Sequence, residues 1–394
     1  MRDSAFGLRS IALLTPGITP YVTGGIQRHS FNLAKHLAQT GIKVDLYHTV
    51  FPGSEDISEL VGMTDAEKKN IFSIEIAWQN RRFPGHYIRS LKAFSEAALR
   101  IYRTRPKVDF IMAKSLTAWS FVEAKRRAEQ LPPIAVNFHG YEMFQPRPTF
   151  RTKMEAALLR PTFLVHAQRA DHVVSYGGRV TEILHKNMCL PREKIIEIPG
   201  GTDPALLSGH PPPTGTKRRF VFLGRYERRK GIEELNAAIM QNPGWAERSQ
   251  FRFIGGIPKN RQLDLPHVTY VGELRSPAKI QAHLRTADVL LCPSHSEGMP
   301  NVIMEGMAAG LAILATDVGA VRLLVSENNG IVLPRSSRQG IEQAVQRFLA
   351  MPNEELNQLK QASLGHVRKF FWPTIAERTR STLADLIKEK EGTG

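Results

Sequence analysis

Cysteine is scarce in this sequence, since Cys189 and Cys292 are the only two in 394 residues. They do not form a C-x-x-C pair, so the sequence excludes a disulfide scaffold, a zinc ribbon and a dithiol redox motif. Because each lies among apolar residues, we expect both to be buried, reduced thiols. That pattern is typical of a cytosolic protein rather than a secreted one.

Long apolar runs are also missing. No window approaches the ~20 consecutive apolar residues that a membrane-spanning helix needs, and the best candidate, residues 302–315, contains Glu305. The first apolar stretch, residues 11–14, is too short for a secretory signal. We therefore expect a cytoplasmic protein, either in solution or peripheral at the inner face of the cytoplasmic membrane.

Acidic residues are outnumbered by basic ones, 37 to 53, which gives a formal charge of +16. The excess is concentrated between residues 81 and 127, interleaved with aromatic residues. The basic residues there are Arg81, Arg82, Arg89, Lys92, Arg100, Arg103, Arg105, Lys107, Lys114, Lys125, Arg126 and Arg127. Such a surface attracts phosphate. An anionic membrane is the favoured partner, since no helix-turn-helix, zinc-finger or RNP motif supports nucleic acid; a solvated basic face without a partner is the alternative.

Short apolar runs alternate with helical stretches along the chain, which predicts parallel sheets covered by helices on both faces. The expected strands are 11–14, 42–47, 108–113, 134–138, 172–175 and 195–198, then 220–224, 251–254, 268–271, 289–292 and 312–316. Between the two sets, three consecutive prolines after Ser208 are typical of a stiff linker. The predicted fold class is α/β, with two tandem Rossmann-like domains facing each other across a cleft.

These patterns also predict the domain boundaries. The first domain spans residues 1–204, the linker 205–218 and the second domain 219–372, and a charged helix occupies 373–394. Ligands of such sheets bind beyond the carboxyl ends of the strands. The expected site is therefore the crevice between the two domains.

The most informative stretch, residues 294–310, follows the expected strand 289–292 and opens a helix. Pro300 suits the first helical turn, where no N–H is needed. A helix start preceded by a glycine is a ready anion site. The N–H groups expected to face the cleft belong to Met299, Asn301 and Val302.

Two glutamates flank this helix start, Glu297 just before it and Glu305 within it. Both could accept hydrogen bonds from the hydroxyls of one ligand, which suits a ribose and a hexose. The helix dipole alone could also favour the two carboxylates. That reading is weaker for Glu305, because it lies in an apolar segment and a buried carboxylate needs partners.

Three further turns follow expected strands. The basic turn 224–231 places Arg225 and Lys230 where they could clamp a diphosphate. The turn Thr23-Gly24-Gly25-Ile26 lets backbone approach a phosphate closely. His139 lies at the carboxyl edge of the strand 134–138. Taken alone, each is as consistent with an ordinary turn or a structural histidine; their shared placement at the cleft favours a ligand site.

Together these motifs resemble the glycosyltransferases of family 4, which have the two-domain architecture called GT-B. The resemblance covers nearly the whole chain and is most specific at residues 297–310. It implies that the second domain binds the donor and the first the acceptor. The resemblance implies that His139, Glu297 and Gly298 contact the donor sugar, with His139 and Glu297 as the catalytic-site pair. It implies that Glu305 binds the ribose. The residues implied at the diphosphate are Gly25, Arg225, Lys230, Met299, Pro300, Asn301 and Val302.

The resemblance further implies transfer with retention of configuration and without a metal or other cofactor, and the chain contains no Asp-x-Asp motif. The donor would be a UDP- or GDP-linked sugar. The basic stretch favours a lipid-linked glycan acceptor, as in bacterial cell-surface polysaccharide or glycolipid synthesis. Two alternatives remain: a nucleotide-sugar epimerase on the same architecture, and a donor-binding partner that has lost catalysis.

Overall fold

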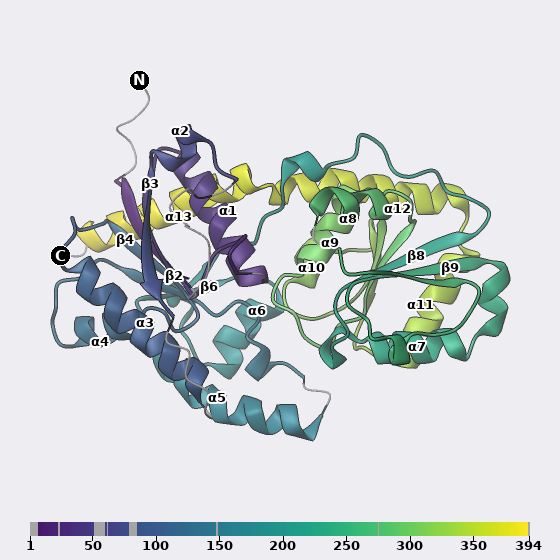
Figure 1. The fold of residues 1–394 in the computed structure, drawn as a ribbon, viewed down its shortest axis with the longest axis horizontal. Helices are drawn as coiled ribbons and strands as arrows, with labels where there is room; N and C mark the ends of the chain where they lie inside the picture. Colours follow the sequence, from purple (N-terminus) through teal and green to yellow (C-terminus); the bar gives the residue numbers. More distant parts are fainter. Residues whose placement is uncertain are drawn as a thin grey trace.

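A computed structural model describes residues 7–22, 24–50, 60, 62–78, 85–146, 149–274 and 276–392. Figure 1 shows two α/β halves side by side, with both chain ends at the first half. Thr23 of the expected glycine turn, and Arg81 and Arg82 of the basic stretch, lie outside the described residues.

The first half is built on a seven-stranded parallel sheet in the order β3-β2-β1-β4-β5-β6-β7. Its strands are β1 (Ser10–Thr15), β2 (Lys43–Val50), β3 (Ile71–Ala77), β4 (Phe110–Lys114), β5 (Ile134–Asn137), β6 (His172–Ser175) and β7 (Ile195–Glu197). Its helices are α1 (Gly25–Gln39), α2 (Asp65–Lys68), α3 (His86–Tyr102), α4 (Trp119–Arg126), α5 (Phe150–Arg169) and α6 (Arg179–Glu182). The central strand β4 is buried along its whole length, as expected of a strand between two helical layers.

The second half repeats the arrangement with a six-stranded parallel sheet in the order β10-β9-β8-β11-β12-β13. Its strands are β8 (Arg218–Leu223), β9 (Ser249–Ile254), β10 (Val268–Gly272), β11 (Val289–Cys292), β12 (Ala312–Thr316) and β13 (Gly330–Leu333). Its helices are α7 (Ile232–Met240), α8 (Pro277–Leu284), α9 (Asn301–Ala308), α10 (Val321–Leu324), α11 (Arg338–Ala350) and α12 (Asn353–Val367). The two sheets confirm the predicted α/β fold class.

The last helix, α13 (Trp372–Gly392), returns to the first half. Trp372, Ile375 and Leu383 of this helix are buried in the same apolar cluster as the face of the first sheet that α1 covers. The chain enters the helix beside an isolated bridge between Thr202 and Phe371. One helix thus ties the end of the chain to its first domain.

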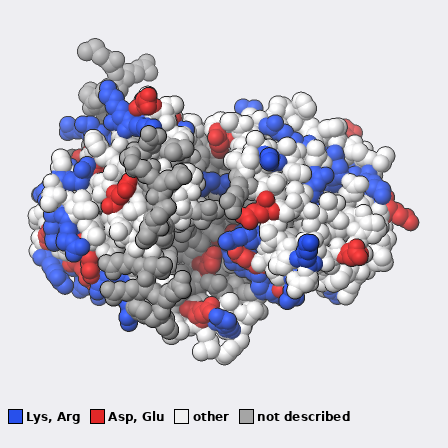
Figure 2. All heavy atoms as spheres, viewed as in Figure 1, with Lys and Arg blue, Asp and Glu red and all other residues white. Residues whose placement is uncertain are grey.

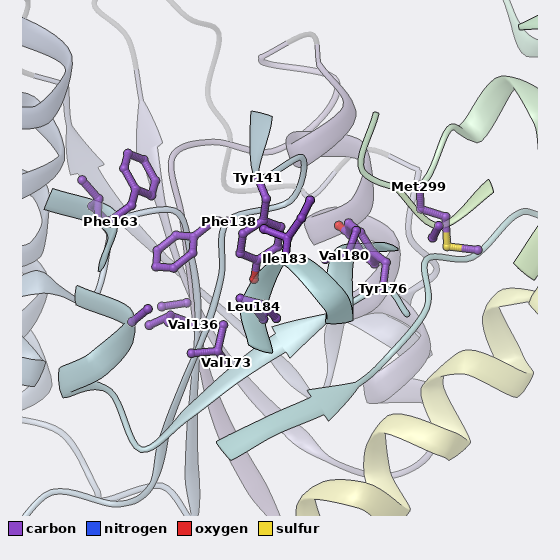
Figure 3. Close-up of a cluster of buried hydrophobic side chains, with 14 of the residues drawn as sticks. Val136, Phe138, Tyr141, Phe163, Val173, Tyr176, Val180, Ile183, Leu184 and Met299 are labelled. Carbon is purple, nitrogen blue, oxygen red and sulfur yellow. The ribbon is translucent and has the colours of Figure 1, made fainter. Parts of the chain in front are cut away.

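The two halves share a continuous apolar core (Figure 3). Phe138, Tyr141 and Tyr176 of the first half belong to one buried cluster with Met299 of the second. The Sδ atom of Met299 also accepts a hydrogen bond from the N–H of Gly200 at 3.0 Å. The halves are therefore packed together directly beneath the cleft.

The structure corrects two expectations about single residues. Cys292 is buried, but Cys189 is exposed, because it sits with a φ of +53° in a turn between two buried neighbours. The basic stretch is not one continuous solvated surface, since Lys114 is buried inside the protein. Arg105 and Lys125 are bound in ion pairs with carboxylates.

No described helix combines the length and apolar character needed to cross a bilayer.

Candidate active site

A cavity of about 380 Å³ lies where the two halves meet. The first half contributes residues that follow β1, β4, β5 and β6, and the second half contributes the loop from β11 to α9 and the turn after β8. Residues from both halves that line it include Gly25, His139, Tyr176, Arg229, Glu297 and Asn301. The cavity therefore lies at the carboxyl edges of both sheets, where the topology predicts a ligand site.

Glu297 is the buried acid of this cavity. Its Oε1 atom accepts from the Lys230 ammonium at 2.6 Å and from the Ser294 hydroxyl at 2.8 Å. The guanidinium of Arg229 lies 3.6 Å from its other oxygen. Burial alone would raise the pKa of the Glu297 carboxyl, but the charges of Lys230 and Arg229 lower it below its ordinary value. Glu297 is thus anionic at neutral pH.

The basic turn after β8 supplies these cations. A short helical turn, Arg228–Lys230, directs Lys230 towards Glu297 and ends at Gly231, whose φ of +70° suits glycine. Arg225 is not brought into the cavity: its side chain is 76% exposed and pairs with Glu227 at 2.7 Å. The structure therefore places Lys230 and Arg229 at the site, and Arg225 at its outer edge.

His139 faces Glu297 from the first half. Its backbone has a φ of +62°, and its N–H donates to the side-chain oxygen of Asn137 at 2.7 Å. The Tyr176 hydroxyl bonds to its Nδ1 atom. Burial and the positive charge of Lys114 lower the pKa of His139 well below the ordinary histidine value. The imidazole is therefore neutral and held in a fixed orientation.

Gly298 makes a close approach between the halves. A Cβ atom built on Gly298 would lie 2.7 Å from the carbonyl oxygen of His139. No side chain fits there without a shift of backbone. Gly25, at the start of α1, has no atom within 4 Å of an added Cβ, so its backbone is open to the cavity.

Glu305 lies in a neighbouring cavity of about 270 Å³, which shares Asn301 and His29 with the first. Its Oε1 atom pairs with Nη2 of Arg28, on α1, at 2.9 Å. Burial raises the pKa of Glu305 above its ordinary value, although Arg28 opposes the shift. Glu297 and Glu305 thus face two adjoining cavities rather than a single one.

The start of α9 separates these cavities. The helix begins at Asn301, and Pro300 is the residue that precedes its first turn. Pro300 and Met299 are buried, while Val302 packs against the core as a half-buried side chain. Of the four residues expected at this helix start, Asn301 lines both cavities and Met299 lines the first.

Four residues at the site were missed by the sequence reasoning. Arg28 and His29 lie on α1, and Lys114 ends β4 beside them. Arg229 is the fourth, and its place next to Lys230 in the basic turn was the only available signal. The other three are brought to the site by the packing of α1 against the sheet, which a motif in the chain does not reveal.

Comparison with known families covers most of the chain. The model for "Glycosyltransferase Family 4" matches residues 23–206, and that for "Glycosyl transferases group 1" matches residues 217–351. The chain belongs to the family 4, group 1 glycosyltransferases. The two matches meet at the proline-rich segment between the sheets.

Two relatives of this glycosyltransferase are 27% and 30% identical to it over the aligned residues. A phosphatidyl-myo-inositol mannosyltransferase of Mycobacterium leprae is 27% identical over 92% of this chain and 94% of its own length. TuaC of Bacillus subtilis, named for teichuronic acid biosynthesis, is 30% identical over 34% of this chain. That match spans only 33% of TuaC's length.

Solved structures share the fold of this glycosyltransferase. A sucrose-phosphate synthase of Thermosynechococcus elongatus superposes with a TM-score of 0.75 at 20% identity, over 97% of this chain and all of that one. HepE of Anabaena, solved in complex with UDP, has a TM-score of 0.65 at 16% identity, over 96% of this chain and all of that one. At these identities the likeness establishes the two-domain architecture.

The glycosyltransferase site offers a carboxylate, two cations and a neutral imidazole around one cavity. A buried carboxylate can accept hydrogen bonds from sugar hydroxyls, and cations in a partly dry site stabilise a developing phosphate charge strongly. No group of three or more His, Cys, Asp or Glu side chains that could hold a metal ion occurs in the described ranges.

Proposed function

We propose that this glycosyltransferase moves a sugar from a nucleotide-diphosphate sugar to a glycan acceptor. The observation that carries the proposal is Glu297, a buried carboxylate held by Lys230 and Arg229, with His139 opposite it in the same cavity. This arrangement puts a hydroxyl acceptor and phosphate-binding cations within one ligand's length. The carboxylate and the cations can therefore contact one ligand without large movements of their side chains.

The proposed roles follow from these positions. Glu297, Gly298 and His139 hold the donor sugar, and Glu305 accepts hydrogen bonds from the ribose in the adjoining cavity. The diphosphate lies along the helix start at residues 299–302, near Gly25 and Lys230. Arg225 reaches it by a swing of its long side chain away from Glu227.

Retention of configuration and metal independence belong to the proposal as well. Lys230, Arg225 and the N-terminus of α9 supply the positive charge that stabilises the leaving diphosphate. His139 is neutral and positions the sugar, rather than removing a proton from the acceptor. The acceptor's proton passes to the leaving phosphate as it departs.

Nucleotide binding is the first test. UDP, GDP, ADP and CDP are compared by thermal shift, because a ligand at ~100 times its dissociation constant stabilises the folded state by ~2.7 kcal/mol. We expect one diphosphate to raise the melting temperature, and Lys230→Met, which weakens binding about tenfold, to roughly halve this stabilisation. Absence of a shift with all four would contradict the proposed donor class.

Transfer is tested with a radiolabelled sugar donor containing the base so identified. Appearance of label in a glycan acceptor supports the transferase. Isomerised donor without transfer would instead identify an epimerase. Binding without either reaction, with Glu297→Ala equal to the parent, would identify an inactive donor-binding partner.

We further propose that the acceptor is lipid-linked and that the first half docks on an anionic membrane. The M. leprae relative is named for a phosphatidyl-inositol acceptor. The strongest support is α5, where Phe150, Met154 and Leu158 recur every four residues with exposures of 77%, 54% and 78%. This helix forms the lower edge of the first half in Figure 1.

Basic side chains accompany this apolar stripe. Arg151, Lys153 and Arg160 are exposed on the same helix, against the single acid Glu155. Lys and Arg also gather along the outer edge of the first half in Figure 2. Each basic side chain near an anionic bilayer contributes on the order of 1 kcal/mol, and apolar side chains insert at the interface.

Liposome flotation tests the membrane proposal. The wild type is expected to float with phosphatidylglycerol vesicles at low salt, and the double variant Phe150→Ser/Leu158→Ser is expected to stay at the bottom. Met240→Ser, which removes an exposed apolar side chain from α7 of the second half, serves as the matched control. If the double variant floats as well as the control, α5 is not the docking surface.

A further inference from the structure

Two lysines of this protein are almost completely buried, and they differ in the hydrogen-bond partners of their ammonium groups. Lys360 is 0% exposed, and its ammonium bonds to the Asp288 carboxylate at 2.9 Å, to the Pro212 carbonyl at 2.6 Å and to the Thr214 hydroxyl at 3.0 Å. Lys114, at the end of β4, is 1% exposed, yet its ammonium forms no hydrogen bond or ion pair with any residue in the described part of the chain. A buried charge without a partner is costly.

Two histidines with unsatisfied ring nitrogens lie within electrostatic reach of Lys114. Within the described ranges, neither ring nitrogen of His29 has a hydrogen-bond partner, and Nε2 of His139 has none. The two rings lie edge to face with centroids 5.3 Å apart. The charge of Lys114 lowers the pKa of both histidines. Three groups that can donate a hydrogen bond are therefore gathered without acceptors.

The two histidines line the 380 Å³ cavity on the side of the first half, whereas Lys114 precedes the lining residue Ser115 and does not itself line the cavity. The open backbone of Gly25 begins the 15-residue helix α1 at the same edge, so the helix dipole adds positive potential there. Two carboxylates also line the cavity: Glu297 is paired with Lys230 and Arg229, and Glu142 lies 3.8 Å from Arg229.

We propose that Lys114, His29 and His139 form a second subsite, which binds an anionic group of the substrate, a carboxylate or a phosphate. The subsite rests on the proposed transferase function and names a chemical class for its sugar. The anion belongs either to the donor, as the carboxylate of a uronic acid, or to the acceptor, as a phosphate or carboxylate on the receiving glycan. The bound anion accepts the hydrogen bonds for which Lys114, His29 and His139 have no acceptor within the described part of the protein.

The side chain of Lys114 is suited to this use. Burial lowers the pKa of Lys114 to about 7, so the empty site holds the ammonium and the neutral amine in similar amounts at neutral pH. An entering anion favours the ammonium. Binding at pH 7 is therefore expected to take up a fraction of a proton from the buffer.

Isothermal titration calorimetry tests the donor and acceptor sources separately. In the donor arm, UDP-glucuronate is compared with UDP-glucose. In the acceptor arm, glucose 6-phosphate is compared with glucose while UDP occupies the donor site. The wild type is expected to prefer the charged probe in one arm, and Lys114→Met to reduce that preference by about tenfold to a hundredfold, as for other hydrogen bonds to charged groups. The arm that responds identifies the source.

Controls keep the test decisive. Lys114→Met is nearly isosteric and removes an unpaired buried charge, so it is expected to fold at least as stably as the wild type. Lys230→Met should weaken both nucleotide sugars equally and leave the preference for the charged probe intact. If UDP does not bind at all, the donor base in the proposed function is wrong, while glucose 6-phosphate alone still reports on the subsite.

Two results overturn the subsite. One is an equal affinity of the wild type for charged and neutral probes in both arms. The other is a preference for the charged probe that Lys114→Met leaves unchanged, with the same proton uptake when binding is measured in buffers of different ionisation enthalpy.

Discussion

Arg28 and Glu305 join the two halves of the molecule by an ion pair of 2.9 Å between Nη2 and Oε1. Arg28 lies on α1 of the first half and is 45% exposed, whereas Glu305 lies on α9 of the second half and is almost fully buried. Glu305, which we propose binds the ribose, is therefore already paired with Arg28 before a nucleotide binds. A ribose that bonds to Glu305 must share or displace Arg28.

We expect Glu305→Gln and Arg28→Gln to have opposite effects on nucleoside diphosphate binding. Glu305→Gln removes an anionic acceptor of the ribose hydroxyls and should weaken binding about tenfold, since hydrogen bonds to charged groups contribute about 1.5–3 kcal/mol. Arg28→Gln leaves the carboxylate free and should leave binding unchanged or tighten it. Calorimetry with both variants decides; equal weakening by the two would show that Arg28 itself contacts the nucleotide.

A separate prediction concerns the basic turn after β8 and its contribution to diphosphate binding. Lys230→Met should weaken nucleoside diphosphate binding about tenfold, because Lys230 lies at the cavity and loses a charge-assisted contact. Arg225→Met should weaken it to a similar degree, because the exposed Arg225 side chain is proposed to swing inward onto the diphosphate. Arg261→Met, an exposed arginine of the same half, is the matched control. An Arg225→Met variant that binds like the control would remove Arg225 from the clamp.

Buried parallel strands were the most predictable part of the fold. The strands β6, β11 and β12 have the expected bounds because each contains a short, buried apolar run between helices. Two strands were missed. The edge strand β3 alternates buried and exposed residues, with Phe72 half exposed, and β13 is only four residues long and begins at Gly330.

The site was predictable where residues are close along the chain and not where packing gathers them. Glu297 and Lys230 belong to local motifs that follow strands, and the structure brings them to 2.6 Å. Lys114 was assigned to a basic surface because it falls within the basic stretch 81–127, yet it is the last residue of a buried strand. A charge count cannot distinguish a solvated lysine from a buried one; the position of its strand in the sheet does.

Gly298 is expected to tolerate no side chain, because an added Cβ would lie 2.7 Å from the carbonyl oxygen of His139 in the opposite half. Gly298→Ala should lower the free energy of unfolding by about 1–3 kcal/mol, as for other overpacked sites, and should abolish transfer by moving Glu297. Gly256→Ala, with no atom within 4 Å of its added Cβ, is the control for chemical denaturation and activity. A Gly298→Ala variant that matches this control in both assays would show that the halves separate freely at this contact.

The buried pair of Asp288 and Lys360 predicts an acid-sensitive second half. Burial would raise the pKa of Asp288, but hydrogen bonds from Arg219 and the charge of Lys360 lower it below its ordinary value. Because the folded-state pKa is the lower one, the stabilisation is complete above the unfolded value of about 3.9 and is lost as the pH falls through the folded-state value. Asp288→Asn, which leaves Lys360 buried without its counter-ion, should cost about 3–5 kcal/mol at pH 7.

Urea denaturation between pH 7 and pH 3 measures this effect, and the difference between wild type and Asp288→Asn should narrow towards the acid end. Glu342→Gln, in a partly exposed pair with Arg338 at 2.9 Å, is the control and should change the unfolding free energy by less than about 1 kcal/mol. If Asp288→Asn lowers the free energy of unfolding no more than this control does, the ion pair between Asp288 and Lys360 does not stabilise the second half. A large loss that persists unchanged at pH 3 would instead assign the effect to shape rather than charge, because a carboxyl with a lower pKa in the folded than in the unfolded state must lose part of its stabilisation below about pH 3.9.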